Sequence, residues 1–300
     1  MQNLAPIALF VYNRPEHTRR TLKFLKANLL ADESRLYIFA DAAKTENEEE
    51  NVAEVADLIN QVDGFKSVKI IKQKSNLGLA KSIINGVTQL TESYGKVIVF
   101  EDDLISSPYT LQYFNEALSL YQNQDKLMHI SAYMYPLVGT DNLPDTFFYR
   151  AVHSWGWATW KTAWDKFNPD IDDLIAQFDA KKKNEFSIEG KMNFWKQMLE
   201  FKNGKNNSWA IRWYASVFLN GGLSLNPTKS LINNIGHDGT GVHSNIEFMY
   251  NVKIHQQAIK NFPQEIVENK TAYALVKNYL AVRKGSIFQR LLRFMKQKMS

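Results

Sequence analysis

Three consecutive acids, Glu101, Asp102 and Asp103, directly follow an apolar run at 97–100. Four apolar residues in succession predict a strand that is buried on both faces, as in a parallel sheet. Adjacent carboxylates repel one another, and apolar surroundings strengthen that repulsion. A divalent cation would remove the conflict, because Mg²⁺ and Mn²⁺ favour carboxylate and phosphate oxygens. We therefore expect a metal at this strand end; the alternative is that the acids cap a helix beginning near 107–108.

The composition is that of a folded protein. The chain has 300 residues, of which 45% are hydrophobic and 13% aromatic, and it has no cysteine. This length suits one large domain, or one domain with an appendage. The missing cysteines exclude disulfides, thiolate metal sites and a cysteine nucleophile. Because the sequence shows neither a signal-peptide pattern nor a run of ~18 apolar residues, we expect a cytoplasmic protein.

The net charge of +5 is concentrated at one end of the chain. Segment 283–300 holds six basic residues and no acid, so the rest of the chain has a net charge of −1. The body is therefore not suited by charge to nucleic acid. Apolar residues recur at helical spacing within the segment, which predicts a basic amphipathic helix that contacts a membrane surface. The alternative is a terminal helix that docks on the body.

Strand and helix patterns alternate through the first half. Strands are predicted at 6–12, 36–40, 68–71, 97–100 and 128–132, with helices at 14–28, 46–62, 108–121 and from after 78 to about 93. This alternation predicts an α/β fold with a mostly parallel sheet flanked by helices. From about residue 133 we expect helices and loops over the carboxyl edge of the sheet, and no separate domain.

Polar residues follow three other predicted strands. Asn13 and Arg14, Asp41, and Asn76 should share one edge with the acids, where open α/β sheets bind ligands. Asp41 could bind a ribose or base, or form a turn. Arg14 could pair with phosphate or be a solvated helix charge, and Asn76 could be a helix N-cap. No P-loop or dinucleotide fingerprint is present, which argues against an ATPase or a dinucleotide oxidoreductase.

Taken in order, these motifs resemble those of GT-A-fold glycosyltransferases of the family-two group. The likeness is greatest to the alpha-1,3-mannosyl-glycoprotein N-acetylglucosaminyltransferase type, which carries Glu-Asp-Asp where many such enzymes carry Asp-x-Asp. The stretches that carry the resemblance are 11–15, 41, 76–81, 99–104, 130–132, 154–157 and 235–239.

The resemblance implies a GT-A (Rossmann-like) domain over 1–265, with a nucleotide-sugar half at about 1–132, an acceptor or lid half at about 133–265, and a helical basic tail at 266–300. It implies transfer of a hexosyl or N-acetylhexosaminyl group from a nucleotide sugar, expected to be a UDP-sugar, to a glycan or lipid-linked acceptor, with inversion. Mn²⁺ or Mg²⁺ would bridge the diphosphate with Asp103 as its ligand. The residues implied for the nucleotide sugar are Asn13, Arg14, Asp41, Asn76, Lys81, Glu101 and Asp102.

Two further segments fit such a site. Trp155 and Trp157 offer flat apolar faces for a sugar ring, although Trp157, Trp160 and Trp164 also have the spacing of a core-facing helix. The glycine-rich segment 236–243 predicts a loop that closes over the donor. Its His243 or His237 could complete the metal shell or contact the diphosphate; the alternative is that they are only polar surface.

The catalytic base is the least defined part. An inverting transferase needs a carboxylate to accept the proton of the acceptor hydroxyl. In the resembled enzymes this acid lies in a Trp-Asp-rich motif, but the corresponding stretch 208–213 contains no acid. We assign the base to Asp238; the alternatives are that another acid does this work or that the mechanism differs. The missing acid leaves open a non-catalytic GT-A protein that binds a glycan or nucleotide sugar; a nucleotidyltransferase is the least favoured alternative, because no glycine-rich, arginine-containing loop is present.

Overall fold

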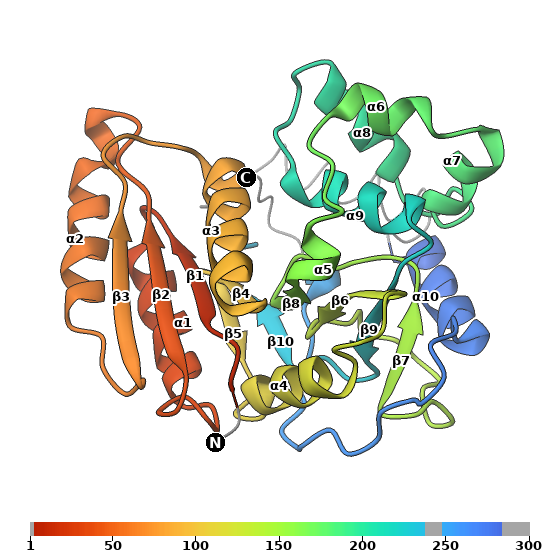
Figure 1. Ribbon diagram of the computed structural model, residues 1–300, viewed down its shortest axis with the longest axis horizontal. Helices are drawn as coiled ribbons and strands as arrows, with labels where there is room; N and C mark the ends of the chain where they lie inside the picture. Colours follow the sequence, from red (N-terminus) through yellow and green to blue (C-terminus); the bar gives the residue numbers. More distant parts are fainter. Residues whose placement is uncertain (1–2, 238–247, 284–300) are drawn as a thin grey trace, which may run out of the picture.

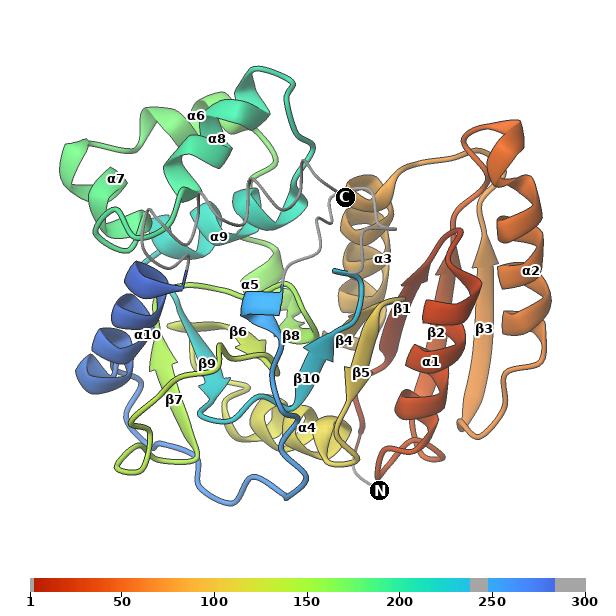
Figure 2. The same cartoon turned by 180° about the vertical axis from the view of Figure 1, so that it is seen from behind.

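A mixed, mostly parallel eight-stranded sheet with helices on both faces forms the centre of the molecule (Figures 1 and 2). The computed structural model describes residues 3–237 and 248–283. The strand order is β3-β2-β1-β4-β8-β6-β9-β7, and β5 and β10 form a separate pair. The Rossmann-like α/β class predicted from the sequence is confirmed.

The first half of the chain supplies the four adjacent parallel strands β3, β2, β1 and β4. Its elements are β1 (Ile7–Val11), α1 (Pro15–Lys26), β2 (Arg35–Ala40), the 3₁₀ helix η1 (Glu46–Glu48), α2 (Glu49–Asn60), β3 (Ser67–Lys72), α3 (Leu79–Tyr94), β4 (Lys96–Glu101), β5 (Leu104–Ser106), α4 (Thr110–Leu120) and β6 (Leu127–Ser131). Strand β1 lies between β2 and β4, with Ile7 paired to both Leu36 and Ile98. The predicted strands and helices of this half are confirmed, with ends that differ by a few residues.

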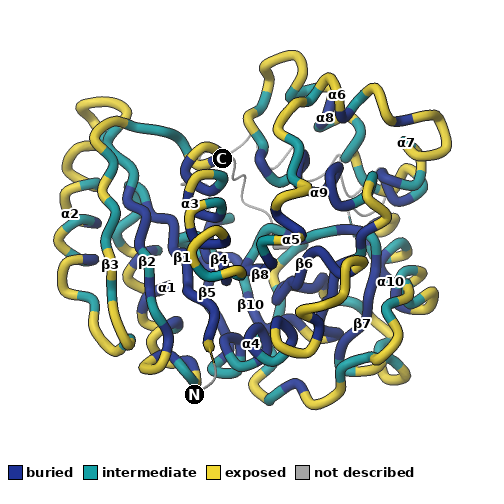
Figure 3. The backbone as a smooth tube through the Cα atoms, viewed as in Figure 1, coloured by how far each residue is buried: buried dark blue, intermediate teal, exposed yellow. Residues whose placement is uncertain are grey.

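Two helical layers bury both faces of these strands. On β4, Ile98 and Phe100 face the layer of α1, α2 and α4, whereas Val97 and Val99 face α3 and parts of the second half. Successive side chains of a strand point to opposite faces, so a strand covered on both sides must be apolar throughout. Figure 3 shows the consequence, with the central strands buried and the outer face of α2 exposed.

The second half contributes strands as well as helices, contrary to the prediction of helices and loops alone. Its elements are β7 (Thr146–Tyr149), β8 (Trp157–Trp160), α5 (Lys161–Trp164), α6 (Ile171–Ala176), α7 (Ala180–Phe186), α8 (Phe194–Lys202), α9 (Trp209–Leu219), β9 (Leu223–Pro227), β10 (Ile232–Asn234), the 3₁₀ helix η2 (Phe248–Tyr250) and α10 (Lys270–Val282). Strand β8 inserts antiparallel between β4 and β6.

The helix predicted from the tryptophan spacing is wrong for Trp157 and Trp160, which lie in β8. In the strand their side chains point to opposite layers, Trp157 toward α3 and α9 and Trp160 toward α4. Because the sheet is covered on both faces, a spacing of three residues buries both tryptophans without a helix.

Helices α6 to α9 gather at one end of the second half, and α10 lies beside β7 (Figure 1). Helix α10 packs on this half through Ala272, Val276 and Leu280. Among the described residues, no helix combines the length and apolarity needed to cross a bilayer.

Candidate functional site

The polar residues predicted to converge do meet at the carboxyl ends of β1 to β4. We call this set, comprising residues 12–14, 41, 76–78 and 101–103, the strand-end rim. The parallel pairing of β1 with β2 and β4, and of β2 with β3, places their carboxyl ends along one edge. Arg14 and Asp103 are joined directly across it, although they are far apart in the sequence.

Asp103 is held by side chains on both of its carboxylate oxygens. Its Oδ2 lies 3.3 Å from Nη1 of Arg14, and its Oδ1 accepts a hydrogen bond of 3.3 Å from Nδ2 of Asn234. The Arg14 and Asp103 side chains are only 14% and 18% exposed, so the alternative of a solvated helix charge does not describe Arg14. Arg14 also contacts His17 at 2.8 Å through Nη2.

Gly236 leaves the space that this ion pair occupies. A Cβ atom at position 236 would lie 2.1 Å from Oδ2 of Asp103 and 2.9 Å from Nη1 of Arg14. The backbone N–H of Gly236 donates to Oδ1 of Asn234 at 2.7 Å, which fixes this close approach. The glycine in the predicted loop therefore has a steric role beside the acids.

The surroundings of the three acids raise the pKa of each carboxyl group. Burial first, and then the charges of Asp103 and Asp102, raise the pKa of Glu101 well above its ordinary value. Burial and the charge of Asp103 raise the pKa of Asp102 to about 7. Burial also raises the pKa of Asp103, opposed by the positive charge of Arg14 and by His17 and His237. Burial and mutual repulsion thus disfavour having all three carboxyl groups ionised together.

The backbone around the acids is held in place by α1 and β1. Thr21 of α1 donates to the carbonyl of Asp102 at 2.8 Å and accepts from the N–H of Leu104 at 3.1 Å. The N–H of Tyr12 donates to Oδ2 of Asp102 at 3.3 Å. The acids do not cap a helix, because β5 follows them and α4 begins after Tyr109 without a side-chain cap. That alternative is wrong.

Asp41 joins the end of β2 to the start of α3. Its Oδ1 accepts from the N–H groups of Ala42 at 3.0 Å and Leu77 at 2.9 Å, and its Oδ2 accepts from Gly78 at 2.8 Å. Asn76 is not the N-cap of α3, which is Gly78. Asn76 instead donates its Nδ2 to the carbonyl of Ala42 at 2.7 Å, so it fixes the same loop.

Glu48 belongs to this region although the sequence reasoning missed it. It accepts hydrogen bonds from the Tyr12 hydroxyl at 2.7 Å and from Nδ2 of Asn13 at 3.1 Å. The spacing of Thr45 and Glu48 is a capping-box pattern that the sequence displays, and the structure contains that box. The long-range contacts with Tyr12 and Asn13 had no local signal.

The rim fits part of a divalent-cation site. Three successive, partly buried carboxylates are hard oxygen donors, and burial and mutual repulsion disfavour their ionised forms unless a cation is nearby. Among the described residues, no three His, Cys, Asp or Glu side chains are grouped so that they could hold a metal alone. This is compatible with Mg²⁺ or Mn²⁺ sites, which often combine one or two carboxylates with substrate phosphates and water.

The two tryptophans predicted to contact sugar lie in different environments. Trp155 is partly exposed, and its ring centroid lies 5.1 Å from that of His237 and 6.0 Å from that of Tyr250. Trp157 has no exposed surface and packs at 5.1 Å on Trp209. Burial therefore argues against the sugar contact predicted for Trp157, whereas Trp155 is partly exposed beside His237.

The remaining residues predicted for the site are Lys81, His237, Asp238 and His243. Lys81 is exposed in the first turn of α3. His237 is near enough to Asp103 to influence its pKa. Asp238, His243 and nearly all of segment 283–300 lie outside the described residues.

Helix α9 supplies no substitute for the missing base. It contains no acid, and its residues Trp209 and Trp213 are buried against Trp157. Arg212 is 7% exposed and lies over the Phe201 ring at 4.4 Å. The stretch that would hold the acid in the resembled enzymes is therefore part of the core here.

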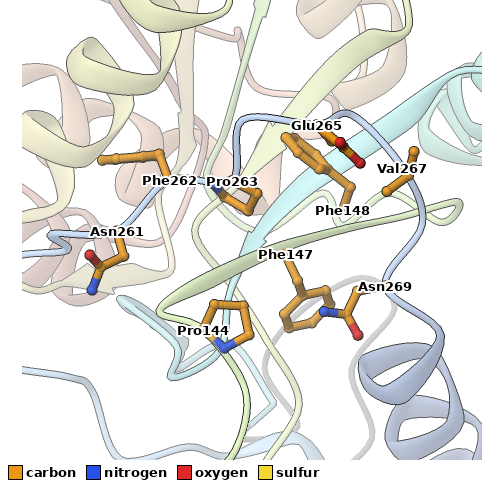
Figure 4. Close-up of a pocket in the computed structure, with 9 residues that line it drawn as sticks. All are labelled: Pro144, Phe147, Phe148, Asn261, Phe262, Pro263, Glu265, Val267 and Asn269. Carbon is orange, nitrogen blue, oxygen red and sulfur yellow. The ribbon is translucent and has the colours of Figure 1, made fainter.

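A hollow of about 320 Å³ lies beside β7, the edge strand at the opposite end of the sheet from β3 (Figure 4). It is lined by residues of β7 and of segment 261–269, with Phe147, Phe148 and Phe262 among the lining side chains. None of its lining residues belongs to the strand-end rim, so this hollow is not part of the site.

Comparison with known proteins gives a family for the part of the chain that contains the rim. Residues 7–133 match the family model described as glycosyl transferase family 2. This stretch is less than half of the chain, but it includes β1 to β6 and all of the rim. This part of the chain is similar to glycosyl transferase family 2, and the sheet with its flanking helices has the corresponding GT-A fold. No curated protein of similar sequence was found.

Two solved structures illustrate the range of structural likeness. TarS of S. aureus matches with 13% identity and a TM-score of 0.30, covering 42% of this chain and 21% of TarS. The chain thus spans about a fifth of the length of TarS. The mannosyltransferase PcManGT of Pyrobaculum calidifontis, in complex with GDP-Man and Mn²⁺, matches with 11% identity and a TM-score of 0.39, covering 73% of each chain.

Proposed function

We propose that this protein is a metal-dependent, inverting glycosyltransferase that moves a hexosyl or N-acetylhexosaminyl group from a UDP-sugar to a hydroxyl of a glycan or lipid-linked acceptor. The observation that carries the proposal is the run of three partly buried carboxylates at the end of β4, of which Asp103 pairs with Arg14 on the rim. Open α/β sheets bind nucleotides at this edge. The family match over 7–133 supports the reaction class.

The hydrogen bonds of Asp41 support a uridine donor. A carboxylate has about four acceptor positions, and three backbone N–H groups already use the two oxygens of Asp41. At most one position, on Oδ2, remains for a base. Uracil presents one ring N–H between two carbonyls, whereas guanine presents two neighbouring N–H donors that would need a carboxylate with both oxygens available.

The metal and the diphosphate belong at Asp103. In this proposal Asp103 would hold Mn²⁺ or Mg²⁺, which would supply positive charge for the departing nucleoside diphosphate. Asp102 beside it would contact the ribose or the sugar. Arg14 and Lys81 supply further positive charge to the phosphates. Asn13, Asn76 and Glu101 complete the nucleotide-sugar contacts, Asn76 by holding the loop at 42. His243 remains a proposed additional ligand.

The proposed reaction balances without a further reagent. The acceptor hydroxyl oxygen forms a bond to the anomeric carbon as the bond from that carbon to the phosphate oxygen breaks. The nucleoside diphosphate leaves with the bonding electrons, and the hydroxyl proton passes to a carboxylate base. We assign this base to Asp238, and Asp238→Asn should lower kcat by about 10²–10⁴-fold if the assignment is correct.

The acceptor is proposed to meet Trp155, whose ring packs against those of His237 and Tyr250. Residues 133–265 form the acceptor half in this proposal, and the basic segment 283–300 contacts an anionic membrane, so that the protein works peripherally on its cytoplasmic face. Binding of the full chain to anionic vesicles, compared with a chain ending at 282, tests the membrane contact.

The decisive experiment measures nucleotide release from a panel of UDP-, GDP-, dTDP- and CMP-sugars, with Mn²⁺ and with EDTA. Wild type should release nucleotide from a UDP-sugar with Mn²⁺ only, and Asp103→Asn should not. Release from a GDP-sugar alone would overturn the uridine assignment. Metal-independent turnover would overturn the role of Asp103.

One observation favours a second candidate, a GT-A protein that binds a nucleotide sugar or glycan without turnover. The helix that should carry the base, α9, is acid-free and buried. Metal-dependent binding of UDP without sugar transfer to any acceptor, measured by calorimetry and product analysis, would favour this candidate.

A further inference from the structure

Glu48 makes contacts that its local role does not require. In a capping box, the acid needs to reach only the N–H of the residue three positions earlier. Glu48 makes that contact, because its Oε2 lies 3.1 Å from the N–H of Thr45. The same carboxylate also accepts from the Tyr12 hydroxyl at 2.7 Å and from Nδ2 of Asn13 at 3.1 Å. These two contacts cross from β1 to the segment after β2.

The contacts of Glu48 close a continuous chain of hydrogen bonds along the rim. The N–H of Lys44 donates to both the Tyr12 hydroxyl, at 3.1 Å, and Oε2 of Glu48, at 3.2 Å. The backbone N–H of Tyr12 then donates to Oδ2 of Asp102. The loop after β2, the end of β1 and the acids of β4 are therefore joined through Tyr12, with Glu48 at the outer end.

Asp41 fastens the other side of the same loop. It binds the N–H groups of Leu77 and Gly78, and Asn76 binds the carbonyl of Ala42. Segment 41–45 is thus tied to β1 by Glu48 and to the start of α3 by Asp41. A loop tied on both sides presents a fixed surface, and a ligand that meets a fixed surface has less ordering to impose when it binds.

We propose that Glu48 is a positioning residue for the nucleoside part of the donor. It holds Tyr12, Asn13 and segment 41–45 in the arrangement that the base and ribose meet, and it does not itself contact the phosphates or the metal. This inference rests on the proposed nucleotide-sugar function, and it adds a residue to that site which neither the family resemblance nor the sequence motifs supplied.

The proposal predicts a defined kinetic signature. Without Glu48, the free protein populates the binding-competent arrangement less, and the apparent Kd rises by the inverse of that fraction. If the competent fraction falls to about one tenth, the Kd rises about tenfold. The bound complex is the same, so kcat at saturating donor should stay within about twofold.

The test compares Glu48→Ala and Glu48→Gln with Glu46→Ala, which removes an exposed acid of the same 3₁₀ helix. Calorimetry with UMP and UDP, and with GMP and GDP as a second pair, gives Kd; donor turnover gives KM and kcat; thermal unfolding checks the fold. We expect Glu48→Ala to raise Kd for UMP and UDP, and KM, about tenfold. Glu48→Gln keeps one acceptor oxygen and should lose less, and Glu46→Ala should change none of these values.

A second variant tests whether Glu48 acts through Tyr12. Tyr12→Phe removes the hydroxyl that Glu48 binds, and its effect on Kd should not add to that of Glu48→Ala, because both remove the same link. Additive effects would overturn the proposal, as would a lowered kcat with unchanged KM, or a lowered melting temperature with unchanged Kd. Wild type that binds none of the four nucleotides would overturn the proposed function itself, whereas equal Kd for wild type and Glu48→Ala would overturn only the role of Glu48.

Discussion

The ion pair between Arg14 and Asp103 predicts an unusual response to removal of a positive charge. A cation that binds Asp103 must displace the guanidinium, whose Nη1 lies 3.3 Å from Oδ2 in a setting where both side chains are largely buried. Replacing Arg14 with Met keeps much of the side-chain length and removes the charge. We therefore expect Arg14→Met to bind Mn²⁺ more tightly than wild type when no nucleotide is present.

The magnitude follows from the interaction that the metal no longer has to break. A hydrogen bond to a charged group contributes about 1.5–3 kcal/mol net. Each 1.4 kcal/mol is a factor of ten in affinity, so Mn²⁺ affinity should rise roughly 10- to 150-fold. Arg14→Met also leaves the acids without their nearest cation, and its stability without metal should fall, because an uncompensated buried charge is costly.

The assay combines Mn²⁺ titration calorimetry with thermal unfolding at increasing Mn²⁺. Ligand binding to the folded state raises stability as its concentration exceeds Kd, so Mn²⁺ should raise the melting temperature of Arg14→Met at lower concentrations than that of wild type. Arg19→Met is the matched control, because Arg19 is 57% exposed on the same helix and pairs with Glu16 and Glu54.

Two results would refute this reasoning. Equal or weaker Mn²⁺ binding by Arg14→Met would mean that Arg14 does not compete with the metal at Asp103. An equal gain in Arg19→Met would mean that general charge, and not the direct pair, controls the affinity. In the proposed function, Arg14 contacts the diphosphate once the metal has displaced it from Asp103. The same variant should therefore bind UDP more weakly than wild type in saturating Mn²⁺.

Substitutions at Gly236, Trp155, Trp157 and His129 test the roles of site residues and of core residues. Gly236→Ala should weaken Mn²⁺ and UDP binding about tenfold or more, because its Cβ would meet the carboxylate of Asp103 at 2.1 Å; Gly222→Ala, whose Cβ would meet Met128 and the carbonyl of Val217 and no residue of the rim, should leave that binding unchanged in the same calorimetry. Trp157→Ala should lower the free energy of unfolding by about 3–5 kcal/mol in urea titrations, whereas Trp155→Ala should cost less stability and raise the KM for the acceptor; the reverse pattern would contradict the assignment of the two tryptophans. Burial lowers the pKa of His129 to about 3, below the ordinary value of about 6.5, so the unfolded state binds more protons and stability should fall as the pH drops from about 6.5 toward 3. At pH 5 the loss from this histidine is about 2 kcal/mol, and His129→Asn should flatten the pH dependence of unfolding unless the histidine is protonated in the folded protein.

Local patterns in the sequence were sufficient for the parallel half of the fold. The apolar run before Glu101 predicts β4, and Pro15 stands at the start of α1, as expected for a residue with a fixed φ angle. Because the carboxyl ends of parallel strands share an edge, the convergence of Arg14, Asp41 and Asp103 also followed from order along the chain. These inferences needed only periodicity, strand ends and the connections between neighbouring elements.

Pairing across the fold could not be read from those patterns. The spacing of Trp157 and Trp160 suits a helix or a doubly covered strand, and only the insertion of β8 between β4 and β6 selected the strand. Asp41 binds backbone N–H groups of a loop 36 residues away, and Glu48 reaches Tyr12 from the neighbouring strand end.

The sequence by itself determined which residue types stand at the strand ends, because secondary structure and charge repulsion act over short stretches of chain. Only the tertiary structure decided which of those groups are joined. Arg14 meets Asp103, and Glu48 meets Tyr12, because β1 lies between β2 and β4. A hydrogen bond needs its atoms within about 3 Å, and that proximity comes from the packing of the whole sheet.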